Sequence, residues 1–590
     1  MVDTTDRFEF SGLRSLPPRS SSIKGPTEPS KIIQVTLVLA PEQTPEAHPA
    51  SLKHRNFLAS APQKRQAMTA EDVAAIFSPD QKHINEINSF CKAHGLRVVN
   101  HSDFRNDITL EGSVQNMNEA FGVELNDYQH QEGICRSHDN ELTLPESLRD
   151  VVIDVIGLDD VPISGPNASS QTGQVADAVV EYSPRDLAKR YRFPDGDGHA
   201  QRIAILNFGP CGYHKSDIEL FFREVLGTQP PVIKEFSIGG LGNDPLPYET
   251  LQKMTRCFNS KDDPREQFTQ EELIWGKATL ETTMDIEIAA GVANAAEICL
   301  YFAPNNARGW YDSIYSALET EGNGAAVPTV ISASWGASEA SWRTAKINSL
   351  ELALEKARLM QVNVCCSSGD LGSVHEHPPS PMDVAKVNYP ASSPRVLACG
   401  GTSLTSNSQS GNLDDTAWKC TTQFGIEASG GGISGYFDLP DFQQDASVPA
   451  HSDLDGAAWL HGDKPADFRG RGIPDIAAFA DVGYRVAIGG ENYVNGGTSA
   501  TTPLIAGLLV LLTENLGRRF GSLNELVYRA ELQPALTAVV VGDNKVVDTA
   551  AAYFKAHDGW NGCCGVGVPD GEKLLKCLRQ IQPDLASSEA

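Results

Sequence analysis

The chain has 590 residues, 41% of them hydrophobic and 21% charged, which is typical of a globular protein with two or more domains. Its formal net charge of −28 argues against nucleic acid or an anionic membrane as a partner. No run approaches the roughly 20 apolar residues of a membrane span, and residues 1–7 lack the pattern of a secretory signal. The 12 cysteines include no C-x-x-C pair, which argues against a zinc or redox motif.

The first part of the chain predicts a tail, a small domain and a linker. Residues 1–30 are rich in Ser, Pro and charge and are expected to be disordered. In residues 31–163, predicted strands (36–39, 96–99, 108–110, 123–125) and helices (73–77, 81–94, 114–121) succeed one another in an order that favours an α+β domain. Residues 164–180 are polar and small, which predicts a linker open to proteolytic processing.

Residues 181–585 carry a different pattern. Short, continuously apolar strands are predicted at 203–206, 298–302, 330–332 and 362–366, with helices such as 217–225 and 349–359 between them. Strands of this kind are buried on both faces, so the pattern predicts an α/β domain with a parallel sheet.

Ser499 lies in a glycine-rich turn that opens the apolar helix 504–512. Glycines allow the sharp bend, and a helix N-terminus favours the negative charge that develops on a nucleophilic hydroxyl. The alternative is that this Gly-Thr-Ser sequence merely caps the helix.

Three acidic residues are candidates for acid–base chemistry. Glu281 and Asp285 are four residues apart in a predicted helix and therefore share one face. Their like charges disfavour joint ionisation, so the pair can accept and pass on a proton, unless it is simply a solvated acidic face. Asp370 lies between glycines directly after a buried strand, where α/β active sites form, although an Asp there also stabilises turns.

Two further features allow a functional interpretation. Trp335 follows a predicted strand and either walls a substrate cleft or caps the core. Near the C-terminus, side-chain oxygens alternate with glycines over residues 548–567, a pattern that suits calcium.

In combination these residues resemble the sedolisin family of serine-carboxyl peptidases, closest to the kumamolisin type. The resemblance extends in order over residues 31–580. Its blocks include Phe193-Pro194-Asp195-Gly196, Glu281-x-x-x-Asp285, Tyr301-Phe302-Ala303-Pro304, Ser334-Trp335-Gly336, Ser368-Gly369-Asp370, Gly430-Gly431-Gly432, Gly470-Arg471-Gly472-Ile473-Pro474-Asp475 and the Ser499 turn. It implies a subtilisin-like catalytic domain at 181–585, preceded by an activation propeptide at 31–163 with a ferredoxin-like α+β fold.

The resemblance also implies roles for single residues. Ser499 would be the nucleophile, Glu281 the general base, Asp285 the residue that orients it, and Asp370 part of the oxyanion hole. Trp335, Gly430 and Gly431 would line the substrate cleft. An ordinary subtilisin would need a His-Gly-Thr-His-like motif, which the sequence lacks. A carboxylate base suits acid, where histidine is protonated.

The sequence departs from the family pattern at two positions. Asn207 stands where the kumamolisin type has a glutamate linked to the triad, so an extended proton relay is not expected. The family's calcium ligands map to the side chains of Asp548 and Asn561 and to the carbonyls of Thr549, His557 and Gly559. Since Asn561 replaces an aspartate, a bound Ca²⁺ should be held more weakly.

The expected protein is a monomeric zymogen that hydrolyses proteins or peptides in acid and is inhibited by its own propeptide. An extracellular location is expected from the family, although no signal peptide is visible. Two alternatives remain open: a tripeptidyl exopeptidase of the same family, and a non-catalytic relative used for binding or inhibition.

Overall fold

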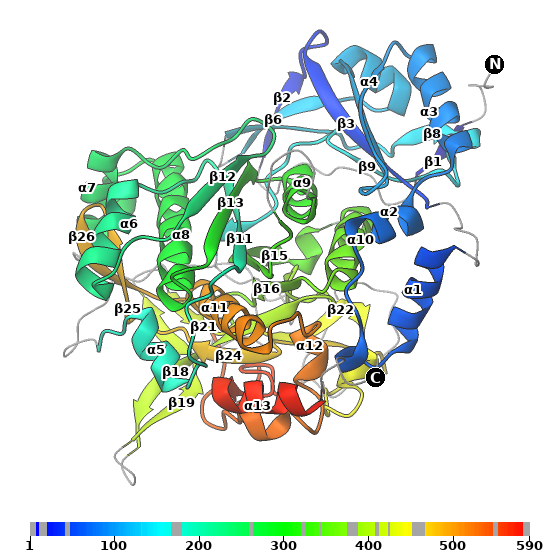
Figure 1. Ribbon diagram of the computed structural model, residues 1–590. Helices are drawn as coiled ribbons and strands as arrows, with labels where there is room; N and C mark the ends of the chain where they lie inside the picture. Colours follow the sequence, from blue (N-terminus) through cyan, green and yellow to red (C-terminus); the bar gives the residue numbers. More distant parts are fainter. Residues whose placement is uncertain are drawn as a thin grey trace.

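The computed structural model describes residues 7–10, 21–41, 48–130, 133–166, 180–258, 263–319, 326–342, 344–373, 387–407, 412–422, 425–450, 467–546 and 553–581. Within these residues the chain forms an N-terminal unit and a larger C-terminal unit (Figure 1). The N-terminal unit, blue to cyan, sits at one end of the larger unit, next to helices α9 (Ala307–Leu318) and α10 (Thr344–Leu359).

A four-stranded antiparallel sheet forms the centre of the N-terminal unit. Its order is β4 (Arg97–Ser102), β5 (Asp107–Ser113), β3 (Ile32–Leu39) and β9 (Val152–Ile156). Alternate residues of β3 point to opposite faces, as strand geometry requires. Leu37 and its neighbours pack against α3 (Gln81–Ala93) and α4 (Val114–Phe121), whereas Val38 on the other face joins the core of the larger unit.

The structure corrects two expectations for this region. Residues 1–30 are not simply a disordered tail, because β1 (Arg7–Glu9) pairs with β8 (Thr143–Pro145), and β2 (Ser22–Pro26) pairs with β6 (Asn126–His130). β6 pairs in turn with β7 (Gly133–Ser137). The prediction of a strand at 123–125 was wrong, because strand pairing begins only at Asn126. Helices α1 (Pro49–Ala59) and α2 (Ala70–Phe77) extend along the larger unit, where Arg65 forms an ion pair with Glu525 at 2.7 Å.

The larger unit is built on an eight-stranded sheet that is parallel except for one edge strand. Its order is β12 (Ile233–Ser237), β13 (Glu297–Pro304), β11 (Arg202–Gly209), β14 (Val330–Ala333), β16 (Asn363–Ser367), β18 (Leu397–Ser406) and β19 (Leu413–Ala417), with β24 (Ile476–Phe479) also paired to β18. Only β19 is antiparallel to its neighbour. This arrangement confirms the predicted parallel sheet.

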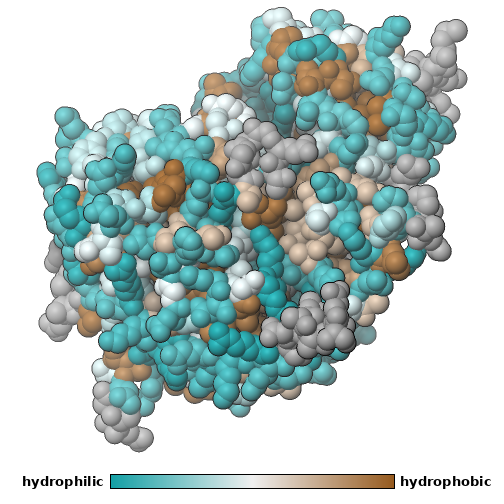
Figure 2. Space-filling view, viewed as in Figure 1, coloured by the Kyte–Doolittle hydropathy of each residue, from teal (hydrophilic) through white to brown (hydrophobic). Residues whose placement is uncertain are grey.

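Helices cover both faces of this sheet. The long helices α8 (Gln270–Val292) and α11 (Thr498–Leu516) pack against each other on one face, and α9 and α10 cover the other. Helix α11 is long and apolar enough to cross a membrane, but 83% of its apolar window is buried inside the protein. It is therefore the central core helix. In the view of Figure 2, hydrophilic residues cover most of the surface and hydrophobic ones form small groups.

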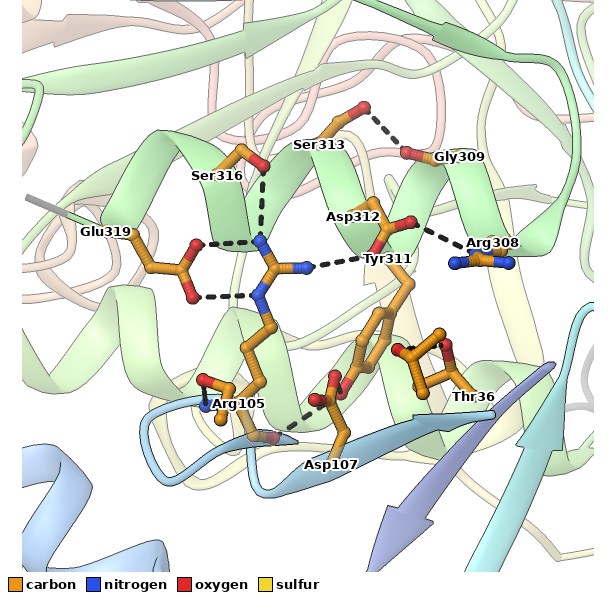
Figure 3. A network of polar contacts seen from close by, with 12 residues as sticks. Thr36, Arg105, Asp107, Arg308, Gly309, Tyr311, Asp312, Ser313, Ser316 and Glu319 are labelled. Atoms are coloured by element: carbon orange, nitrogen blue, oxygen red, sulfur yellow. Dashed lines mark hydrogen bonds and ion pairs between the residues drawn. The ribbon is translucent and has the colours of Figure 1, made fainter. Parts of the chain in front are cut away.

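Ion pairs join the two units (Figure 3). Arg105 from the β4–β5 turn donates to both carboxylate oxygens of Glu319 at 2.7 Å and to Asp312 at 2.8 Å. The Tyr311 hydroxyl donates to Asp107 at 3.1 Å, and burial raises the pKa of Asp107 to about 7. Lys356 of α10 donates to the Phe104 carbonyl at 2.6 Å, and burial lowers its pKa to about 7. The N-terminal unit is thus held through partly desolvated charges.

Candidate active site

Helix α8 carries two buried carboxyl groups one turn apart. Its N-terminus is fixed by a capping box between Thr269 and Glu272. Glu281 and Asp285 are both 0% exposed, so the solvated acidic face considered above is excluded. Burial, and then the charge of Asp285, raise the pKa of Glu281 well above its ordinary value; burial likewise raises the pKa of Asp285. Neither oxygen of Glu281 has a well-aligned hydrogen-bond partner among the described residues.

Ser499 lies in the first turn of α11, where the field of the helix favours a developing negative charge. The residue that caps the helix is Gly497, with a φ of +100° that a side chain would strain, and no side chain caps this end. Ser499 is therefore not a helix cap. Its hydroxyl donates to the carbonyl of Ser334 at 3.2 Å, and it also lies close enough to Glu281 to lower the pKa of that carboxyl in part.

Ser334 joins α8 to α11. Its hydroxyl donates to Asp285 Oδ1 at 2.7 Å, and its oxygen lies 3.3 Å from the carbonyl oxygen of Ser499. Ser334 comes between β14 and β15 (Trp335–Ser338), at the carboxyl end of the sheet. Residues separated by more than 200 positions, from Glu281 to Ser499, therefore meet at one edge of the sheet.

Asp370 lies beyond the carboxyl end of β16, beside the first turn of α11. Its Oδ1 accepts hydrogen bonds from the backbone N–H of Thr498 at 2.9 Å and from the Thr498 hydroxyl at 2.7 Å. Its Oδ2 is buried without a hydrogen-bond partner among the described residues. Burial, and then the charge of Glu427, raise the pKa of Asp370 well above its ordinary value. A neutral Asp370 would have one O–H donor free beside Ser499.

The three expected cleft residues lie near this group. Trp335 is 2% exposed and makes an edge contact with Phe208, with ring centroids 5.7 Å apart. Gly430 and Gly431 pass close to the Asp370 loop: a Cβ on Gly430 would lie 2.2 Å from the Ser368 carbonyl oxygen. Asn207 stands where the kumamolisin type has a glutamate, and its side-chain amide donates to the Ile205 carbonyl at 3.1 Å.

The residues expected to bind calcium are only partly described. Asp548 and Thr549 lie outside the described residues, whereas His557, Gly559 and Asn561 lie within them. Asn561 Oδ1 accepts from the backbone N–H of Cys563 at 3.1 Å and of Cys564 at 3.0 Å, and Nδ2 donates to the His557 carbonyl at 2.9 Å.

These contacts fix the orientation of the Asn561 amide. Its N–H group, and not its oxygen, faces the His557 carbonyl, which is one of the expected calcium ligands. Calcium binding stays a prediction.

The comparisons with known proteins follow the division of the chain. Residues 19–161 match the pro-kumamolisin activation domain and residues 273–546 match the subtilase family. Kumamolisin from Bacillus sp. (strain MN-32) is 33% identical over 95% of both chains. The chain belongs to the sedolisin family of serine peptidases.

More distant relatives agree with this assignment. Tripeptidyl-peptidase sed5 from Aspergillus fumigatus is 25% identical over 96% of both chains, and human tripeptidyl-peptidase 1 is 24% identical over 96% of this chain and 94% of its own. Pseudomonas sedolisin, solved with two molecules of pseudo-iodotyrostatin, superposes with a TM-score of 0.51 at 20% identity, covering 69% of this chain and all of that one. The fold is that of a subtilisin-like sedolisin, and the N-terminal unit is its propeptide, an intramolecular inhibitor.

The sequence patterns assign no separate role to two of the residues that meet at this site. Ser334 belongs to the Ser-Trp-Gly block, and its hydroxyl donates to Asp285. Thr498 belongs to the Ser499 turn, and its backbone N–H donates to Asp370.

Proposed function

We propose that this sedolisin is a monomeric, acid-acting serine-carboxyl endopeptidase made as a zymogen, with Ser499 as nucleophile. The observation that carries the proposal is the convergence of Ser499, the Glu281–Asp285 pair and Asp370 at the carboxyl edge of the sheet. No histidine is among the groups that contact Ser499, Ser334 or Asp370 in the described residues.

The proposed reaction begins when Glu281 takes the proton of the Ser499 hydroxyl and the oxygen attacks the peptide carbonyl carbon. Asp370, protonated on Oδ2, donates a hydrogen bond to the oxyanion. The C–N bond then breaks as Glu281 returns the proton to the leaving amine. Water hydrolyses the acyl-enzyme by the same steps. Asp285, held by a hydrogen bond from Ser334, positions Glu281.

The pH dependence follows from the carboxyl groups. Two buried carboxyl groups one turn apart resist joint ionisation, so the pair holds a single proton over a wide pH range. In that state one carboxylate is available as base while Asp370 remains a donor. Activity should rise as the pair first ionises and fall as Asp370 loses its proton, so carboxyl groups rather than a histidine set both limits of the pH profile.

Endopeptidase action is supported by the path of the propeptide. Strand β10 (Gly165–Pro166) pairs antiparallel with β15, with Gly165 opposite Gly336 and Pro166 opposite Trp335. The chain continues on the N-terminal side of this pair to Ser164, which Asn305 binds, so β15 accommodates a chain that a tripeptidyl peptidase would need to block. The test compares cleavage of N-blocked and free-N-terminus peptides by the processed protein. Cleavage of the blocked peptides supports an endopeptidase, and cleavage of the free peptides alone supports the tripeptidyl alternative.

A further inference from the structure

Ser164, which directly follows the propeptide in the linker, is bound on every polar atom by the peptidase domain. Asn305, which follows β13, accepts from the Ser164 backbone N–H at 3.2 Å and donates to the Ser164 carbonyl at 2.7 Å. The Ser164 hydroxyl donates to Asn305 Oδ1 at 2.8 Å and accepts from the indole N–H of Trp310 at 3.0 Å. Ser164 is only 7% exposed.

These contacts separate into two kinds. The Asn305 amide meets the N–H and C=O of one residue as a neighbouring strand would, and it does so for any extended peptide. The two bonds to the hydroxyl depend on the side chain. Trp310 is fully buried and stacks on Phe208, with ring centroids 4.1 Å apart, so its N–H is held in place. An apolar side chain at this position would leave that buried donor without a partner.

The pairing of β10 with β15 shows how far along a bound chain the contacts with Asn305 and Trp310 lie from Ser499. Gly165 lies opposite Gly336 and Pro166 opposite Trp335. A substrate chain that continues the same antiparallel register meets Ser334 with its next residue, and Ser334 contacts Ser499. When that residue carries the scissile carbonyl, the residue bound by Asn305 and Trp310 is the fourth on the N-terminal side of the scissile bond.

We propose that Asn305 and Trp310 form a substrate subsite that selects a serine, or another small hydroxyl side chain, at the fourth residue before the scissile bond. Ser164 occupies this subsite in the zymogen, so the propeptide inhibits as a substrate-like chain. The inference rests on the proposed peptidase activity at Ser499. Asn305 contributes affinity for any backbone, and Asn305 and Trp310 each make one of the two hydrogen bonds that select the hydroxyl.

The test uses the processed protein and N-blocked, internally quenched peptides that differ only at that fourth position, as Ser, Ala or Leu. The hydrogen bonds of the Ser hydroxyl to Asn305 and Trp310 involve no charged group and are therefore of moderate strength. We expect kcat/KM for the Ser peptide to exceed that for the Ala peptide by roughly 3- to 10-fold. None of Ser, Asn and Trp titrates in acid, so this ratio should stay constant from pH 3 to 6 while kcat/KM itself changes.

Two variants separate the subsite from a general structural effect. Trp310→Phe should lower cleavage of the Ser peptide alone and reduce the Ser-to-Ala ratio, because the indole donor to the Ser hydroxyl is lost while the hydroxyl bond to Asn305 Oδ1 remains. Asn305→Ala should lower cleavage of every peptide, mainly through KM, and also reduce the ratio. A second pair of peptides serves as a control: they differ as Gly or Ala at the position after the varied one, which corresponds to Gly165. The ratio of kcat/KM between these two peptides should be the same for Trp310→Phe as for the wild type.

A Ser-to-Ala ratio near 1 in the wild type, or a ratio that neither variant changes, would overturn the subsite. If the wild type cleaves no peptide, the proposed peptidase activity fails. In that case the binding of the same labelled peptides, measured by fluorescence anisotropy, still tests the subsite. The subsite is supported if the Ser peptide binds more tightly than the Ala peptide and this difference is lost in Asn305→Ala. Equal binding of the two peptides refutes it.

Discussion

The role of Asp370 can be tested by making its proposed protonated state permanent. Asp370 Oδ1 already accepts two hydrogen bonds from Thr498, at 2.9 and 2.7 Å, whereas Oδ2 has no partner among the described residues. In Asp370→Asn the two Thr498 donors should fix the amide oxygen at the Oδ1 position. The amide N–H then takes the place of the proposed Oδ2–H, so the variant keeps an oxyanion donor at every pH.

The expected magnitudes differ sharply between two substitutions. Asp370→Asn should retain kcat within about tenfold, whereas Asp370→Ala removes the donor and should lower kcat by roughly 10²–10³. Asp370→Ala also leaves the buried Thr498 donors without an acceptor, which should reduce the free energy of unfolding by roughly 1–3 kcal/mol.

The assay is the pH profile of kcat/KM for one N-blocked peptide. The pKa of Asp370 is raised chiefly by burial, so wild-type activity should fall as the pH rises through that value. In Asp370→Asn the part of the alkaline fall caused by Asp370 should disappear. If Asp370→Asn is as inactive as Asp370→Ala, or keeps the full alkaline fall, Asp370 is not a protonated oxyanion donor.

Three further outcomes are expected. Ser334→Ala should lower kcat by about tenfold and shift the acid limb of the pH profile, because Asp285 loses a hydrogen bond that favours its ionised form; an unchanged profile would contradict the positioning role. Arg105→Ala removes both hydrogen bonds of Glu319 to Arg105 and one of the two ion pairs of Asp312, which keeps its pair with Arg308, at a cost of roughly 1–3 kcal/mol, so this zymogen should process faster at a given pH than a control with exposed Arg55→Ala. If the expected site binds calcium, chelation should lower the unfolding temperature and added Ca²⁺ should restore it; a temperature that chelation leaves unchanged would contradict the predicted metal site.

Stability should also depend on pH in a defined direction. Burial raises the pKa of Asp107 to about 7 and that of Asp154 to about 6, both on the propeptide sheet. A carboxyl with a raised folded pKa contributes most stability below its unfolded pKa of about 4, and this contribution is lost as the pH rises through the folded value. These two groups should therefore favour the docked propeptide in acid, and the docked propeptide should become less stable as the pH rises through 6 to 7.

Much of the fold and of the site was predictable from local patterns. The apolar runs predicted the parallel strands, and the spacing of Glu281 and Asp285 predicted their common helix face. The convergence of Ser334, Asp370 and Ser499 depends on sheet order and crossover helices, which no local pattern specifies. The register of Gly165 on Gly336 and the orientation of the Asn561 amide likewise depend on contacts between segments that are far apart in sequence.

The most direct test of the proposed carboxylate-dependent nucleophile is acid activation of the purified full chain. On incubation near pH 4, wild type should shorten by the mass of the propeptide and then cleave an N-blocked peptide, while Ser499→Ala and Glu281→Gln should stay full length. Mass spectrometry follows the first event, and a fluorophosphonate probe should label Ser499 in the product. A wild-type chain that neither shortens nor cleaves peptide, or a Glu281→Gln variant that does both at the wild-type rate, would contradict the account.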